Sequence, residues 1–112
     1  MLNGLGASLE SYLDLLAVRQ KLISSNIANV DTPGYKTRDL DFQTEFQSVL
    51  QGGQPHAREV TGLQAHNDGN NVSIDREARL LSENSLRFSA VSQLLRGQIR
   101  NMKSAIDEGK NG

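Results

Sequence analysis

Residues 25–35 read SNIANVDTPGY, and they close a long amphipathic pattern with a polar corner. The last four, Thr32-Pro33-Gly34-Tyr35, suit a type II turn, because proline fixes φ at the second position and glycine supplies a positive φ at the third. An asparagine amide both donates and accepts hydrogen bonds. The stretch therefore predicts either a simple helix stop with a turn, or a fixed elbow whose asparagines bridge backbone groups.

Upstream of this corner the sequence predicts a long helix from about residue 5 to residue 28, since its apolar residues follow helical spacing. The heptad positions are Leu2, Leu9, Leu16, Ile23 and Val30. Arg19, Gln20 and Asn26 interrupt the apolar stripe, and polar residues in such a seam fix the register of packing at some cost in stability.

Downstream, the same heptad pattern predicts a second and longer helix from about residue 74 to residue 107. Its heptad residues are Ile74, Leu81, Phe88, Leu95 and Met102. Ser73 is the expected N-cap, and Asp75 and Glu77 place negative charge in the first turn, where the helix dipole favours it. Gly109 is the expected stop.

Between the two helices the periodicity is lost. An extended piece follows the corner, and a short helix over about residues 41–50 carries Phe42 and Phe46 on one face. Residues 51–71 are rich in Gly, Gln, Asn and His and predict a mobile loop. The histidines and Asp68 in this loop show no pattern of metal ligation, so no metal or cofactor is expected.

The charged side chains outside the loop are also not expected to form a catalytic site. Asp39, Asp41 and Glu45 are expected to be solvated or paired with Arg38, and not catalytic. The arginines of the final helix are expected to form a solvated face, or to pair with acidic groups of adjacent subunits. These arginines are Arg76, Arg79, Arg87, Arg96 and Arg100.

The predicted fold class is all-α: two long amphipathic helices form an antiparallel coiled-coil hairpin, with a short arm and a flexible middle loop. We divide this single domain into residues 1–50, 51–71 and 72–112. Both apolar stripes are wider than one seam needs, so each subunit is expected to require neighbours and to be partly disordered alone. Which heptad residues face other subunits stays open at this point.

The overall composition excludes several classes of protein. The chain has 12 basic and 13 acidic residues and no cysteine, which gives no nucleic-acid footprint, no disulfide and no thiolate metal site. No apolar run approaches the roughly 18 residues of a membrane span. The N-terminus lacks the features of a cleavable signal peptide. Because catalytic motifs are also missing, an enzyme is not expected.

The motif in SNIANVDTPGY resembles the N-terminal signature of the flagellar axial family of rod, hook and hook-associated proteins. In that family it ends the first helix of the inner coiled-coil domain, and the length of the match favours the elbow. The matching residues are Asn26, Ile27, Ala28, Asn29, Thr32, Pro33, Gly34 and Tyr35. The chain has no room for the large β-rich outer domains of hook and distal-rod members. YKTRDLDF and DGNNVSIDREARLLSENSLRF resemble a short proximal-rod subunit instead.

This resemblance implies a structural role in the periplasmic rod of the flagellar basal body, between the MS ring and the distal rod, transmitting torque. It implies export through the flagellar type III apparatus without a cleaved signal, and folding on assembly. The implied partners are copies of the chain, other rod proteins, the MS ring with its rod adaptor protein, and the export gate. Phe42 and Phe46 fit the spacing of a family export-gate segment; packing on the helical hairpin or on a neighbouring subunit is the other interpretation. The alternatives are a sibling rod subunit or a secreted helical-hairpin adaptor.

Overall fold

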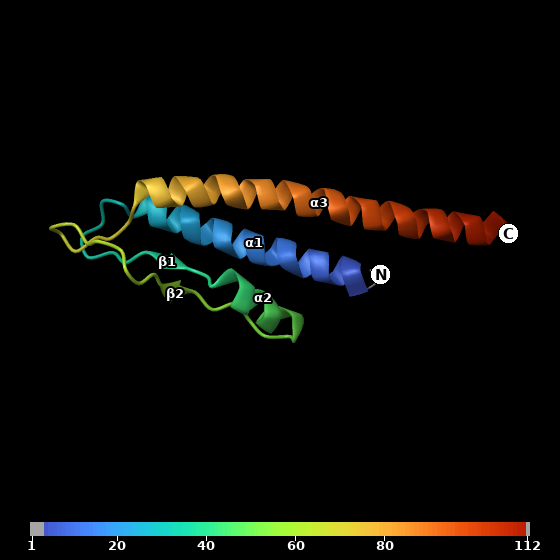
Figure 1. Ribbon diagram of the computed structural model, residues 1–112, viewed down its shortest axis with the longest axis horizontal. Coiled ribbons are helices and arrows are strands. Elements are labelled where there is room, and N and C mark those ends of the chain that lie inside the picture. The colour runs from blue at the N-terminus through green and yellow to red at the C-terminus, as the bar shows by residue number, and fades with distance from the viewer. Residues whose placement is uncertain (1–3, 112) are drawn as a thin grey trace.

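Two long helices lie side by side and antiparallel, as Figure 1 shows for α1 (Gly4–Ala28) and α3 (Ile74–Asn111), and α3 extends beyond the N-terminal end of α1. The computed structural model describes residues 4–111, so heptad residue Leu2 lies outside the described part. The molecule is elongated, with extents of 70 × 25 × 17 Å. The predicted antiparallel hairpin is confirmed.

The predicted start of α3 is confirmed, whereas its predicted end is wrong. The Ser73 hydroxyl accepts a hydrogen bond from the backbone N–H of Arg76 at 3.2 Å, as an N-cap does. At the other end, the helix continues through Gly109 to Asn111. Glycine costs only about 1 kcal/mol in a helix relative to alanine, so one glycine in the last turn does not by itself end the helix.

The corner after α1 is a type II turn. The backbone N–H of Tyr35 donates to the carbonyl of Thr32 at 3.2 Å, and Gly34 has a φ of +78°. Only glycine adopts this left-handed conformation without strain, which explains the Pro-Gly pair in the sequence. The turn sends the chain back along α1.

The returning arm holds two elements, α2 (Phe42–Leu50) and a two-stranded ladder that the sequence did not predict. Strand β1 (Arg38–Asp39) pairs antiparallel with β2 (Arg58–Glu59), with Arg38 opposite Glu59. Residues 51–71 therefore contain a strand that returns beside the arm. Period-2 patterning cannot reveal strands of two residues, because two positions define no period.

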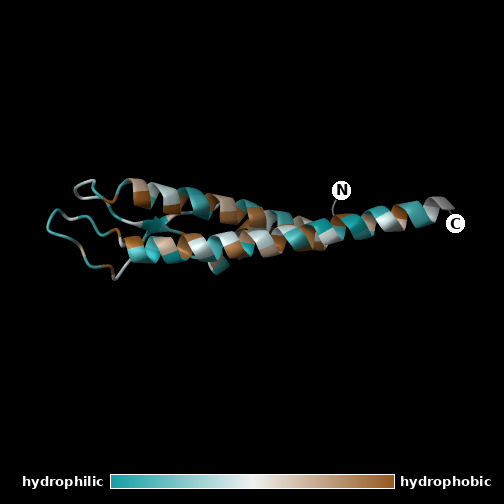
Figure 2. Ribbon diagram, turned by 90° about the horizontal axis from the view of Figure 1, so that it is seen from above, coloured by the Kyte–Doolittle hydropathy of each residue, from teal (hydrophilic) through white to brown (hydrophobic). Residues whose placement is uncertain are grey.

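The apolar core of this hairpin is small. Its buried apolar side chains are Leu15, Leu16, Ile23, Leu40 and Val72. On α3, the positions most deeply buried against the rest of the chain are polar, Glu77 and Asn84, seven residues apart. The heptad residues Ile74 and Phe88 are instead 47% and 44% exposed. Apolar segments continue along α3 beyond the N-terminal end of α1 (Figure 2).

Among residues 4–111, neither α1 nor α3 combines the length and the apolar character that a membrane-spanning helix requires.

Candidate functional site

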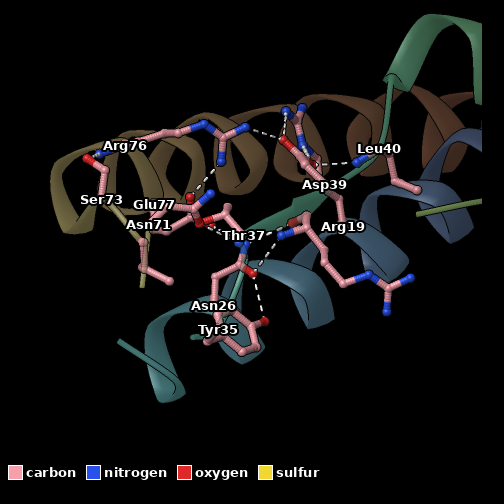
Figure 3. Close-up of polar contacts among 12 residues, drawn as sticks. Arg19, Asn26, Tyr35, Thr37, Asp39, Leu40, Asn71, Ser73, Arg76 and Glu77 are labelled. Carbon is pink, nitrogen blue, oxygen red and sulfur yellow. Dashed lines mark hydrogen bonds and ion pairs between the residues drawn. The ribbon is translucent and has the colours of Figure 1, made fainter. Parts of the chain in front are cut away.

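Asn26 occupies the centre of a polar network near the C-terminal end of α1, and its side chain is fully buried. Its Nδ2 donates to the carbonyl of Arg38 at 2.8 Å and to Glu77 Oε1 at 2.5 Å. Its Oδ1 accepts from the Arg38 N–H at 3.1 Å and from the Tyr35 hydroxyl at 2.9 Å. All four hydrogen-bonding positions of the amide are used, so Asn26 ties α1 to the arm and to α3 (Figure 3).

A charged cluster continues this network through Asp39 in β1. Asp39 accepts hydrogen bonds from Arg19 Nε and Nη2, both at 3.0 Å, and from Arg76 Nη2 at 2.8 Å. Arg76 also pairs with Glu77 Oε2 at 2.6 Å. Two guanidinium groups and two carboxylates therefore meet in a largely buried, electrically balanced cluster that joins α1, β1 and α3 (Figure 3).

Two opposing effects act on the acidity of Asp39. Burial by itself raises the pKa of this carboxyl group, because the charged form loses its water. The hydrogen bonds from Arg19 and from the Leu40 backbone, with the positive charge of Arg19 and the contact from Arg76, outweigh burial and hold the pKa below its ordinary value. Asp39 is thus a permanently ionised anchor at neutral pH.

The prediction that Asp39 and Glu45 are solvated or paired with Arg38 is wrong. Arg38 contributes its backbone to Asn26, while its guanidinium group points to the carbonyl of Ala57 at 3.5 Å. Glu45 is buried in α2 and accepts the His56 backbone N–H at 2.6 Å. The charged partners of Asp39 lie at least 20 positions away in the chain, and His56 lies 11 positions from Glu45, so local sequence gave no sign of these contacts.

Two further asparagines, Asn70 and Asn71, hold the end of the middle segment against the corner. Asn70 is fully buried, and its Nδ2 donates to the carbonyls of Asn29 and Thr32, both at 2.8 Å. Asn71 Oδ1 accepts the Thr37 N–H at 2.7 Å. The Asn29 carbonyl also accepts the Thr32 N–H at 3.0 Å, and the Thr32 carbonyl accepts the Tyr35 N–H at 3.2 Å, so Asn70 is a second donor to each. Sequence reasoning missed both residues; the only signal was an Asn-Asn pair just before the N-cap of α3.

The eight corner-motif residues divide by chemistry. Asn26, Asn29 and Tyr35 are buried or half-buried and hydrogen-bonded, and the exposed Thr32 donates its hydroxyl to Asn29 Oδ1 at 3.0 Å. The exposed members are Ile27, Ala28, Thr32, Pro33 and Gly34. The motif thus combines residues that form hydrogen bonds inside the chain with residues that are exposed on its surface.

Phe42 and Phe46 of α2 pack edge-on against Tyr12 of α1, with ring centroids 4.9 and 5.2 Å from the tyrosine ring. The guanidinium carbon of Arg87 from α3 lies 5.8 Å from the centroid of Phe42. All three rings are half-buried. This aromatic cluster docks α2 onto the hairpin near the middle of α1 (Figure 1).

The arrangement of these groups is structural in character. Asp39 and Glu77 both contact guanidinium groups. Within residues 4–111, no three His, Asp or Glu side chains are grouped so that they could hold a metal ion. What the network does is fix the positions of α1, the arm and α3 relative to one another.

Comparison with known proteins assigns the chain to a family. Residues 10–36, which include the corner motif, match the family model described as "Flagella basal body rod protein". The chain is 34% identical to the flagellar basal body rod protein FlgB of Escherichia coli (strain K12), over 97% of this chain and 99% of that protein. It is 29% identical to FlgB of Bacillus subtilis (strain 168), over 98% of each.

The alignment with the Escherichia coli protein spans 138 positions against 112 residues here, so the relative carries segments that this chain lacks. The match nevertheless runs through both long helices and the corner between them. The chain therefore belongs to the FlgB family of flagellar basal body rod proteins, as a structural and non-enzymatic subunit of that rod.

Proposed function

We propose that this chain is a proximal-rod subunit that links the MS ring to the distal rod and transmits torque. The observation that carries this proposal is an incomplete core. Five apolar side chains are buried, while nine large apolar side chains among residues 4–111 are exposed. Six of these nine lie on α3. A soluble monomer gains nothing from such a surface, whereas a shaft buries it between subunits.

The corner is proposed to act as a fixed elbow within this shaft. To change the angle between α1 and the arm, the three hydrogen bonds that Asn26 makes with Tyr35 and Arg38 have to break together. Each buried bond contributes on the order of 1 kcal/mol, and leaving its partners unsatisfied costs more. A joint of this kind passes a twisting force from one segment to the next with little bending.

Export and assembly follow from the same surface. The chain is proposed to pass the flagellar type III apparatus unfolded, without a cleaved signal, and to complete its fold on docking. Its proposed partners are copies of itself, other rod proteins, and the MS ring with its rod adaptor protein. Ile74 and Phe88 are the heptad residues that are proposed to face other subunits, because they are exposed in the single chain.

Phe42 and Phe46 are proposed to be read by the export gate. In the folded chain both rings are held against Tyr12, so the pair is freely accessible only before folding. Secretion of a variant lacking residues 42–46 should fall sharply, while Thr44→Ala, a change at an exposed position between the two rings, should secrete normally. Normal secretion of the deletion variant would contradict this part of the proposal.

The rod assignment is tested by genetic replacement. A strain that lacks its own FlgB should regain rods and motility when this chain is supplied, and a map of the intact basal body should place the chain between the MS ring and the distal rod. Circular dichroism of the purified chain should show low or labile helicity. A cooperative, concentration-independent melt of a monomer would favour a non-polymerising adaptor.

A further inference from the structure

A groove of about 650 Å³ lies between α1 and α3, beside the seam of the hairpin. Ala17 and Phe88 contribute apolar surface to it, and Phe88 is 44% exposed. Its charged lining residues are Lys21 and Arg96, and no acidic residue lines it among those described. Neither cation has an ion-pair partner within residues 4–111. The groove is thus apolar, cationic and open.

Asn84 marks this groove as incomplete in a single chain. Its side chain lines the groove and is only 4% exposed. Its Nδ2 donates to the Leu16 carbonyl and to Gln20 Oε1, both at 3.1 Å. Its Oδ1 is buried and accepts no hydrogen bond from the described residues. A buried acceptor without a donor is unfavourable, so an occupant that brings a donor would complete this site.

The end of α3 is the second incomplete element. The contacts of Asn26 with Glu77 and of Leu16 with Asn84 set the hairpin register, which places Gly4 opposite about residue 98 at equal rise along both helices. Beyond that point α3 extends without α1 beside it (Figures 1 and 2). We call residues 99–109 the overhang; at 1.5 Å per residue it is about 16 Å long.

The overhang matches the groove in length and in spacing. Along α3 the groove runs from Asn84 to Arg96, or about 18 Å. The overhang presents Ile99, Met102 and Ile106 at positions i, i+3 and i+7, and the two isoleucines are 48% and 58% exposed. The groove repeats this spacing with Ser85, Phe88 and Ser92. The serines leave room opposite the isoleucines, and Phe88 meets the flexible Met102.

We propose that the overhang of one copy occupies the α1–α3 groove of a second copy, head to tail, with the two α3 helices parallel and offset by about 14 residues, or 21 Å. This proposal rests on the proposed rod function and deepens it. Asp107 and Glu108, at the negative end of the α3 dipole, then lie within one turn of Arg96 of the second copy. Two different surfaces meet, so each added copy leaves a free groove and a free overhang, and an open filament results.

Charge reversal tests this polarity in the full chain. Arg96→Glu should weaken self-association roughly fivefold in sedimentation analysis, and adding Asp107→Lys and Glu108→Lys to the same chain should restore it. Lys21→Glu is the matched control, because it reverses a charge at the opposite end of the same groove. It should change association less than twofold. An ineffective Arg96→Glu, or rescue of Lys21→Glu by the two lysines, would overturn the head-to-tail geometry.

Disulfide trapping tests the offset, since the chain has no cysteine of its own. In a mixture of Ser92→Cys and Ile106→Cys chains, the mixed disulfide should exceed either homodimer. Ser82→Cys is exposed on α3 outside the groove and should give little mixed product with Ile106→Cys. Equal trapping at both serines, or a chain that stays monomeric at every concentration, would refute the proposal.

The two proposals fail separately. If Arg96→Glu leaves self-association unchanged and the chain still builds rods and restores motility, the groove contact is wrong and the rod function stands. If self-association follows the charge pattern while the chain never restores rods, the groove contact stands and the rod function is wrong.

Discussion

Asn26 in α1 and Glu77 in α3 are 51 positions apart in the chain, yet a hydrogen bond of 2.5 Å joins Asn26 Nδ2 to Glu77 Oε1. Both side chains are fully buried. Glu77 is also paired with Arg76, which in turn contacts Asp39 of the arm. The first and last helices and the arm therefore meet at one polar centre, next to the type II turn.

Asn26→Ala should lower the free energy of unfolding by about 2–4 kcal/mol, because it leaves the Arg38 N–H and carbonyl without a partner and removes the donor to Glu77 Oε1. Thermal melts followed by circular dichroism, in sulfate to favour the compact state, would measure the change. Asn67→Ala, at an exposed position, serves as control and should stay within about 0.5 kcal/mol. Equal melting temperatures for the two variants would contradict the role of Asn26.

The lowered pKa of Asp39 predicts how the stability of the chain depends on pH. Its folded pKa is below the unfolded value of about 3.9, so its stabilisation is present above that pH and is lost as the pH falls through the folded pKa. Asp39→Asn should reduce the loss of stability on acidification. It should also destabilise the chain at neutral pH, because Arg19 and Arg76 lose their counter-charge. Urea midpoints measured from neutral to acidic pH test this. Asp41→Asn, which removes a nearby exposed carboxylate, is the control and should lose stability on acidification as the unchanged chain does.

Gly34→Ala and Gly97→Ala should have opposite effects on the isolated chain. No atom lies within 4 Å of a Cβ placed at either glycine, so neither change causes a clash. Gly34 has a φ of +78°, where alanine is strained by about 1 kcal/mol. Gly97 is inside α3, where alanine is favoured by about 1 kcal/mol. Melting temperatures should fall for the first variant and rise for the second; a fall for both would show that Gly97 is needed for another contact.

Tyr12→Ala should release α2 from the hairpin, because both phenylalanine rings of α2 pack on this tyrosine. We expect a loss of about 2 kcal/mol and faster proteolysis between α2 and β2, with little effect on the contact between α1 and α3. Leu50→Ala is the control: Leu50 lies on α2 but is 48% exposed, so its removal should leave proteolysis unchanged. Uniform loosening of the whole hairpin would contradict independent docking of α2.

Several elements were predictable because their signals are local. The two long helices follow from apolar spacing, the N-cap of α3 from Ser73, and the turn from Pro33-Gly34. The short helix α2 also lies close to its predicted bounds. The length of the corner motif gave the family, and the comparisons confirm that assignment.

The sequence by itself determined the helices, the turn and the family, since each depends on residues within a few positions of one another. Only the tertiary structure decided the partners of Asn26, Asp39 and Asn70, and it turned part of the apolar stripe of α3, including Ile74 and Phe88, toward solvent. The physical reason is that hydrophobic spacing shows which side of a helix is apolar but not which part of that side a single neighbouring helix covers. A buried polar contact, in turn, depends on where distant segments come to lie once the chain has folded.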